Sequence, residues 1–146
     1  MSAPDRTGYG ARQSALLGAL LAGGDPPEGF AAAQAAAAGG SLRRKRGRVV
    51  AGAWPALFLD AGDRFDAYAR ELDTAGDPVA DGLAFARWLG VRNLGDDARV
   101  EVLLARASLR RVFVGAARLD GQVLLVARMP GVGIGSSRLR TARDRH

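Results

Sequence analysis

The sequence predicts an α+β protein in which an N-terminal bundle of about five to six short helices precedes a C-terminal antiparallel β-hairpin. Two observations predict this order. Apolar residues recur three and four positions apart through most of the chain up to Ser108, which is helical spacing. After Ser108 the pattern changes to short β-branched and apolar runs on either side of Asp120-Gly121, a pair typical of a two-residue hairpin turn.

The length of the chain suits one domain with a small appendage. Its 146 residues are enough to bury a proper core. We expect a disordered N-terminus over 1–10, a helical domain over 11–108, a β-hairpin over 109–135 and a basic disordered tail over 136–146. Because a lone two-stranded hairpin is only marginally stable, the hairpin must pack on the helices or pair with something else.

Glycines and prolines divide the first part of the chain into short helices. Four leucines at 16, 17, 20 and 21 predict a helix that ends at the Gly-Gly-Asp-Pro-Pro run over 23–27. A second helix is expected over 30–38 and should close at Gly39-Gly40. Ser41 then stands where the N-cap of a third helix belongs, and Pro55 marks the end of that helix or a bend in it.

The third helix carries a run of cations beside an apolar stripe. The stripe consists of Leu42, Arg46, Val49, Val50, Ala53 and Trp54. Because an unpaired buried charge is unfavourable, Arg46 should pair with an acid of the middle segment, such as Asp60, Asp63 or Asp66, or else face a ligand. The neighbouring cations are expected to point away from the stripe; they are Arg43, Arg44, Lys45 and Arg48.

Three further helices follow before the hairpin. The first has the apolar face Phe65, Tyr68, Ala69 and Leu72. The second begins at Asp77-Pro78, an N-cap acid before a proline at the first helical position, and ends at Gly90. Its buried face is expected to be Val79, Leu83, Ala86 and Leu89, with Phe85 and Trp88 off centre. The third begins at Asp96-Asp97 and buries Val100, Leu103, Leu104 and Ala107.

Composition narrows the function classes. The chain has no cysteine, which excludes disulfides and thiolate chemistry, and its single histidine is His146, the last residue, which excludes a histidine base or a histidine metal cluster. Acid pairs such as Asp60 with Asp63 are expected to cap helices. The sequence therefore predicts no enzyme, no metal site and no cofactor. A start without a signal-peptide pattern, and the lack of a long apolar run, predict a cytoplasmic protein without a membrane span.

One set of motifs resembles a known family. The motifs are DPPEGF at 25–30, LRRKRGRVVAGAWPAL at 42–57, GDRF at 62–65 and ADGLAFARWL at 80–89, followed by MPGVGIG at 129–135. Their order resembles a bacterial family named for a proposed DNA-binding domain, and most closely its short actinobacterial members. The similarity covers roughly residues 12–135. This chain is shorter than the larger relatives and has a reduced C-terminal part.

The resemblance implies a partner protein. Larger relatives act with multinuclear non-haem iron oxidases that modify ribosomally made peptides, as in methanobactin and bufferin biosynthesis. We therefore expect a non-catalytic adaptor that binds such an enzyme and helps to present a ribosomal precursor peptide to it. Its partner-binding residues would be Arg43, Arg44, Arg46, Arg48, Trp54, Phe85 and Trp88. Its peptide-binding residues, on a strand edge that accepts an extended chain, would be Val112, Val114, Leu124 and Val126.

Two other functions remain open from the sequence. A net charge of +6 and the basic helix over 42–54 fit a nucleic-acid-binding protein in which arginines neutralise phosphates. Against this, the helix offers few residues that read base edges, such as asparagine, glutamine or serine. An enzyme without a recognisable motif is the third hypothesis, and it would need activity from the purified chain alone.

Overall fold

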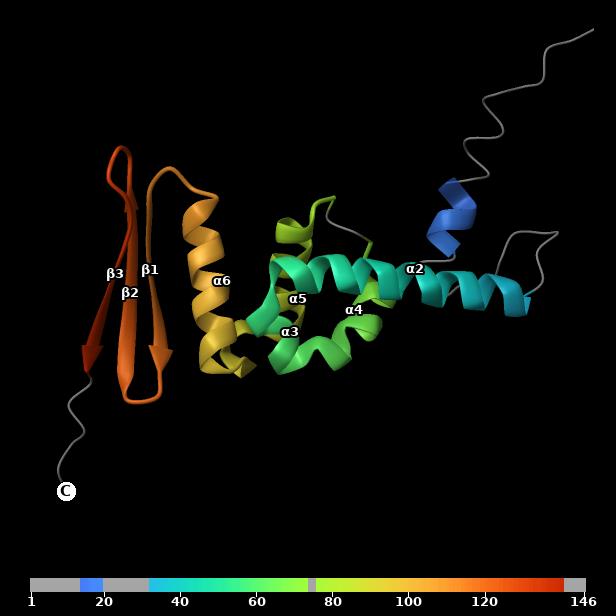
Figure 1. Ribbon diagram of the computed structural model, residues 1–146, viewed down its shortest axis with the longest axis horizontal. Coiled ribbons are helices and arrows are strands. Elements are labelled where there is room, and N and C mark those ends of the chain that lie inside the picture. Colours follow the sequence, from blue (N-terminus) through green and yellow to red (C-terminus); the bar gives the residue numbers. More distant parts are fainter. Residues whose placement is uncertain (1–13, 20–31, 74–75, 141–146) are drawn as a thin grey trace, which may run out of the picture.

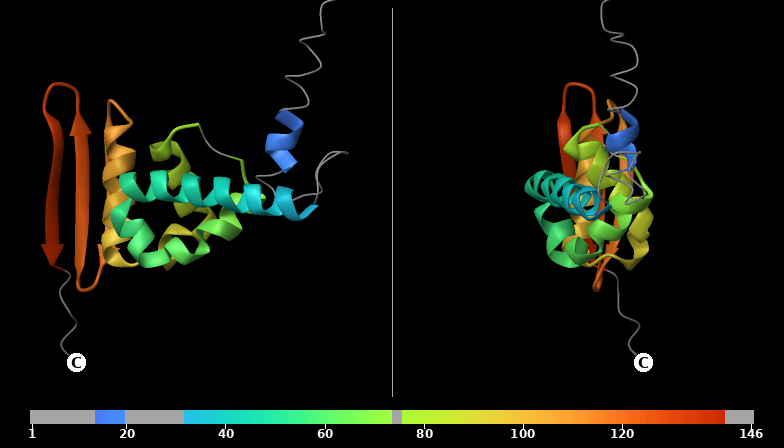
Figure 2. Two further views of the ribbon diagram at one scale, coloured as in Figure 1. Left: turned by 45° about the vertical axis from the view of Figure 1, so that its right-hand side comes forward. Right: turned by 90° about the vertical axis from the view of Figure 1, so that its right-hand side faces the viewer.

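The computed structural model describes residues 14–19, 32–73 and 76–140, and it has the α+β order that the sequence predicts. A three-stranded antiparallel sheet, in the order β1-β2-β3, forms one end of the molecule (Figure 1). Helix α6 (Asp96–Ser108) lies along one face of the sheet, and the other labelled helices lie beyond α6 (Figure 2). These are α2 (Ala32–Ala53), α3 (Pro55–Ala61), α4 (Phe65–Glu71) and α5 (Pro78–Leu89), with 3-10 turns η1 (Gly62–Arg64) and η2 (Val91–Asn93). Residues 14–19 are also helical, as the leucine spacing predicts.

Helix α2 runs without a break through Gly39, Gly40 and Ser41. The prediction of two helices separated at this glycine pair is therefore wrong. Each glycine weakens a helix by only about 1 kcal/mol relative to alanine, and the alanines and arginines on either side are strong helix formers. The predicted stop at Pro55 is confirmed: Trp54 leaves the helical conformation at φ −134°, ψ 63°, as expected for the residue before a proline.

Helices α3 and α6 cap each other. The carboxylate of Glu101, on α6, accepts hydrogen bonds from the first free backbone N–H groups of α3, at 3.3 Å from Ala56 and 2.8 Å from Leu57. In the other direction, Asp60 accepts the N–H of Gly95, the N-cap residue of α6, at 2.8 Å. Asp60 thus has the capping role predicted for it, but it caps a helix distant in sequence.

The main core lies between the helices α2 to α6. Trp54, Leu57, Tyr68 and Phe85 are fully buried there. The rings of Phe58, Phe65, Tyr68, Phe85 and Trp88 pack together with centroid separations between 5.0 and 6.3 Å. The indole N–H of Trp54 donates to the carbonyl of Pro78 at 3.0 Å, so this large side chain is fixed at its polar end as well.

A smaller core joins α6 to the sheet. The strands are β1 (Phe113–Leu119), β2 (Gln122–Met129) and β3 (Gly133–Arg140). Leu103 and Ala107 of α6 pack against Ala117, Leu124 and Val126. The hairpin at Asp120-Gly121 is confirmed, since Leu119 pairs with Gln122 and Gly121 takes a positive φ of 67°.

The C-terminal part of the chain contains a third strand, β3, which is longer than the short strand over 132–134 that the sequence suggests. A disordered tail was predicted from residue 136, yet residues 136–140 belong to β3, which pairs with β2 along its length. Gly131 and Gly133 take φ values of 79° and 85°, which turn the chain back after Met129-Pro130. These two glycines therefore form a tight turn between β2 and β3. The segments 1–10 and 141–146 lie outside the described residues.

The close approach of α5 to Trp54 gives a sharp test of this packing. A Cβ at Gly82 would stand 2.1 Å from the indole nitrogen of Trp54, so Gly82→Ala forces the core apart. We expect a loss of about 1–3 kcal/mol in the free energy of unfolding, measured by urea denaturation. Gly52→Ala is the matched control, because a Cβ there meets nothing within 4 Å and alanine favours the helix. Equal stability of the two variants would contradict the packing described.

Candidate functional site

The cations of α2 divide into two buried and three exposed residues. Arg43 and Arg46 are buried or nearly so, whereas Arg44, Lys45 and Arg48 are exposed. Arg43 was expected to point away from the core; instead its Nε donates to Asp66 at 2.9 Å. Arg46 pairs with Asp81 at 2.6 Å, and not with any of the three acids predicted for it. Both buried arginines therefore hold the fold together and have little surface to offer a partner.

Arg46 lies at the centre of a hydrogen-bond network between α2, α4 and α5. Its guanidinium donates to both oxygens of Asp81, at 2.7 and 2.6 Å, and to the carbonyl oxygens of Leu72 and Asp73. The hydroxyl of Tyr68 donates to Asp81 at 2.6 Å. The guanidinium carbon also lies 5.1 Å from the centroid of the Tyr68 ring, within cation–π distance. Each of the three guanidinium nitrogens of Arg46 thus donates to at least one protein group.

These contacts shift the ionisation of the groups involved. Burial, helped by the hydrogen bond to Asp81, raises the pKa of Tyr68, so the phenol stays protonated. For Arg46, burial acts to lower the pKa, but the hydrogen bond to Asp81 and the charge of that carboxylate outweigh it and the pKa is raised. The hydrogen bond from Arg43 lowers the pKa of Asp66, and Arg70 adds to this effect. Asp66 therefore stabilises the fold above its unfolded pKa, and the contribution is lost as pH falls.

Asp81 was not singled out from the sequence, although its position carried a signal. It is 1% exposed on α5, in line with Asp77 and Phe85 at four-residue spacing. An acid on a buried helix face, in a chain that also has an arginine on the buried face of another helix, indicates a buried ion pair. The signal was incomplete, because the face predicted to be buried, Val79, Leu83, Ala86 and Leu89, did not include Asp81.

Two of the three aromatic residues predicted to bind a partner belong to the core. Trp54 and Phe85 are 1% and 0% exposed, so neither side chain reaches the surface. Phe85 was expected to lie off the centre of the buried stripe, but α5 packs against α2, α4 and α6 and so buries a wider arc. Trp88 is half-buried, and its indole N–H donates to Glu71 at 2.7 Å. It stays a predicted partner contact together with Arg44 and Arg48.

The sheet separates the four predicted peptide-binding residues. Leu124 and Val126 point toward α6 and are buried, because β2 is the central strand and this face forms the small core. Val112 and Val114 are exposed. Only Val112 and Val114 are therefore accessible for a peptide, at the free edge of β1.

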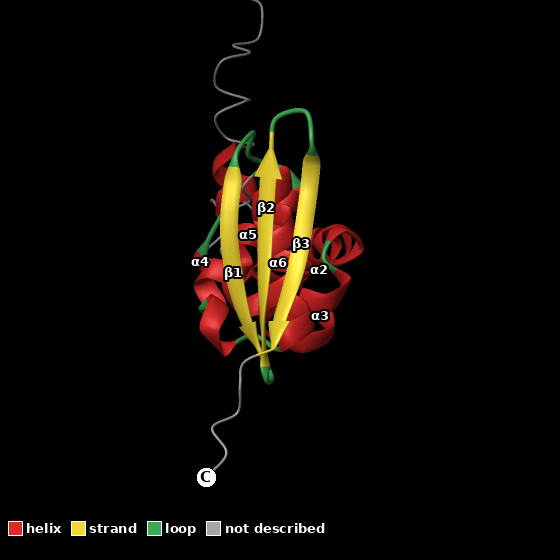
Figure 3. Ribbon diagram, turned by 90° about the vertical axis from the view of Figure 1, so that its left-hand side faces the viewer, coloured by secondary structure: helices red, strands yellow, loops and turns green. Residues whose placement is uncertain are grey.

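No described helix covers the opposite face of the sheet, as Figure 3 shows. We call it the outer sheet face. Strand register places its apolar members together, and Gly135 and Ser137 of β3 lie on the same face. The apolar members are Val114, Ala116, Val123, Leu125, Ala127 and Leu139. Val114 is 82% exposed and Leu125, on the central strand, is 39% exposed. Arg118 is the one charged residue of β1 on this face.

Other site types were sought in the described residues. No group of three or more histidine, cysteine, aspartate or glutamate side chains among them could hold a metal ion. None of the described helices is long and apolar enough to cross a membrane. A cavity of about 300 Å³ lies between α2 and the start of α5, lined by Lys45, Arg46, Val49 and Pro78 among others.

Breaking the buried ion pair tests its role in the fold. Asp81→Asn leaves the charge of Arg46 buried without its carboxylate, so we expect a loss of about 3–5 kcal/mol in the free energy of unfolding. Asp63→Asn is the control, since Asp63 is exposed and makes no ion pair with a described residue. It should change the stability by no more than about 0.5 kcal/mol. Chemical denaturation of both variants measures the difference, and similar midpoints would show that the pair contributes little.

The comparisons with known proteins identify the family of the helical part. No curated protein and no solved structure matches the chain. A family model described as "SCO6045-like, C-terminal domain" matches residues 10–91. The matched segment includes α2 to α5 with the ion pairs of Arg43 and Arg46, and ends at the first residue of η2. Since it spans more than half of the 146 residues, the chain belongs to the SCO6045-like C-terminal domain family.

Proposed function

We propose that this protein is a non-catalytic partner of a multinuclear non-haem iron oxidase that modifies a ribosomal peptide. The resemblance of the motifs at 42–57 and 80–89 to partner subunits of such enzymes is the first support. The protein acts by binding: it docks on the enzyme and helps to present the peptide. The outer sheet face is the surface that carries this proposal.

The chemistry of the outer sheet face suits a protein partner. Soluble chains rarely leave a contiguous apolar face in water, and such faces mark interaction sites. Here the small core on the other side uses Leu124 and Val126, so α6 already covers one face and leaves the second open. Covering Val114, Leu125 and Leu139 removes apolar surface from water, which drives association.

In this proposal the peptide binds along the edge strand β1. β1 is an edge strand, and no strand among the described residues pairs with the main-chain groups at its outer edge. Arg99 donates to the carbonyl of Arg118, which shows that this carbonyl points away from β2. By the alternation of a strand, the main-chain groups of Val114 and Ala116 point the same way. An extended peptide can form hydrogen bonds with these main-chain groups and so extend the sheet, with the side chains of Val112 and Val114 beside it.

A charge placed on the outer sheet face should prevent docking. Leu125→Glu would bury an unpaired carboxylate in the interface, so we expect at least about a tenfold loss of complex with a co-expressed iron oxidase. The measurement is co-purification at a salt concentration that screens surface charges.

Leu104→Glu is the matched control for this experiment. Leu104 has the same exposed fraction as Leu125, 39%, but lies on α6 and not on the outer sheet face. It should leave the complex intact, and thermal unfolding should show that both variants fold. Independent elution of the unaltered protein and the oxidase would contradict the proposed function itself.

Nucleic-acid binding through α2 is the second candidate function. The exposed cations Arg44, Lys45 and Arg48 favour it, although the ion pairs of Arg43 and Arg46 remove two charges from the predicted basic face. If this function holds, a short DNA duplex should bind with an affinity that falls steeply as salt rises. The double variant Arg44→Gln, Arg48→Gln should reduce the slope of log affinity against log salt concentration by the equivalent of about two phosphate contacts. An unchanged slope would remove this candidate.

A further inference from the structure

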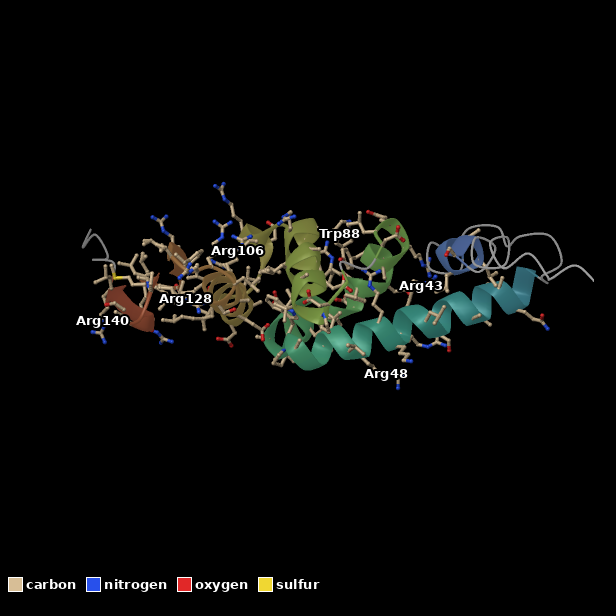
Figure 4. All side chains as sticks on the ribbon, turned by 90° about the horizontal axis from the view of Figure 1, so that it is seen from above. Arg43, Arg48, Trp88, Arg106, Arg128 and Arg140 are labelled. Atoms are coloured by element: carbon tan, nitrogen blue, oxygen red, sulfur yellow. The ribbon has the colours of Figure 1, made fainter. Side chains whose placement is uncertain are left out.

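Two cavities border α6 on the side of the molecule opposite to the α2 cations. One, of about 450 Å³, lies between α6, η2 and β1, and the other, of about 380 Å³, between α5, the end of α6 and Phe113. Arg106 lines both, so the two cavities adjoin at this residue, and we call them together the α6 groove. Figure 4 shows Arg106 and Arg48 on opposite sides of the molecule.

Arginines without an acid partner line the α6 groove. Arg92 and Arg106 border the first cavity, and Arg87, Arg106 and Arg110 border the second. All four are exposed, and none forms an ion pair within the described residues. Arg99 also lines the groove, but it is engaged by Asp96 and by the carbonyls of Leu94 and Arg118. Four like charges around one groove repel each other, and an anionic ligand relieves that repulsion.

Apolar residues line the groove as well. Val91, Val102, Leu103 and Ala117 border the first cavity, and Leu83, Leu109 and Phe113 border the second. A ligand that fills the groove therefore needs apolar groups as well as negative charges. The length of β1 from Phe113 to Ala117 corresponds to about 13 Å, which about four residues of extended polypeptide would span.

We propose that the α6 groove binds a segment of polypeptide in which acidic and apolar side chains alternate. The forks of Arg92 and Arg106 match carboxylates in pairs of parallel hydrogen bonds, and the apolar side chains of the segment fill the two cavities. A nucleic-acid strand fits less well, because its bases need flat aromatic surfaces for stacking and Phe113 is the one aromatic residue lining the groove. The inference rests on the arginines and the cavities and does not require the iron-oxidase partner, although the first cavity borders the edge of β1 at Ala116 and Arg118.

The test measures fluorescence anisotropy with a short labelled peptide of alternating glutamate and leucine, added to the full chain at near-physiological salt. We expect saturable binding that Arg106→Gln weakens by about tenfold or more, since it removes a charged fork shared by both cavities. Arg48→Gln is the matched control on the opposite side and should leave the affinity unchanged. Peptides in which lysine replaces glutamate, or serine replaces leucine, should bind at least about tenfold more weakly.

Several results would overturn the proposal. No saturable binding of the glutamate–leucine peptide would do so, and so would equal losses in Arg106→Gln and Arg48→Gln. Tighter binding of single-stranded DNA, with the same dependence on Arg106, would assign the groove to nucleic acid. Leu125→Glu should retain peptide binding. This separates the groove from the outer sheet face, so that either site can fail without the other.

Discussion

The buried ion pair of Arg46 and Asp81 is the constraint on which the helical part depends. Burying either charge alone would be unfavourable. The rotation of α2 and α5 about their axes, and their positions along those axes, must therefore bring the two side chains together. Tyr68 brings α4 into the same arrangement through its hydroxyl. Asp81 is followed by Gly82, the residue that gives Trp54 room beside α5. Two adjacent residues of α5 therefore fix the helix in place: Asp81 makes the buried ion pair, and Gly82 makes room for the indole ring of Trp54.

The sequence predicted the order of elements well because caps and turns are local. Asp77-Pro78, Gly90 and Asp120-Gly121 act through bonds within a few residues, and all three behave as expected. The failures concern tertiary effects. Gly39-Gly40 did not stop α2, because flanking helix formers outweighed them, and Phe85 is buried because three helices cover α5. Among the candidate site residues, the pattern separated Arg46 from its neighbours, but which acid it meets depends on how α2 and α5 cross.

Helix α6 belongs to both cores and joins the sheet to the helical part. Val102 packs toward the helices and Leu103, the next residue, toward the sheet. Polar contacts reinforce both sides: Glu101 caps α3, Asp96 accepts the backbone N–H of Asp120, and Arg128 donates to the last carbonyls of α6. The family match ends at residue 91, so α6 and the sheet lie beyond the matched segment. The outer sheet face is thus carried by the part of the chain outside the match, yet firmly attached to it.

No strand in the described part of the chain pairs with the outer edge of β3, and this affects how copies of the protein meet one another. An open edge strand is a template for self-association, and β3 is eight residues long and exposed throughout. Its last part carries Arg138 and Arg140. When two copies approach through this edge, these like charges oppose each other, most strongly at low ionic strength. The arginines thus disfavour self-assembly into extended sheets. An uncharged or acidic strand from a different protein would not be repelled in this way.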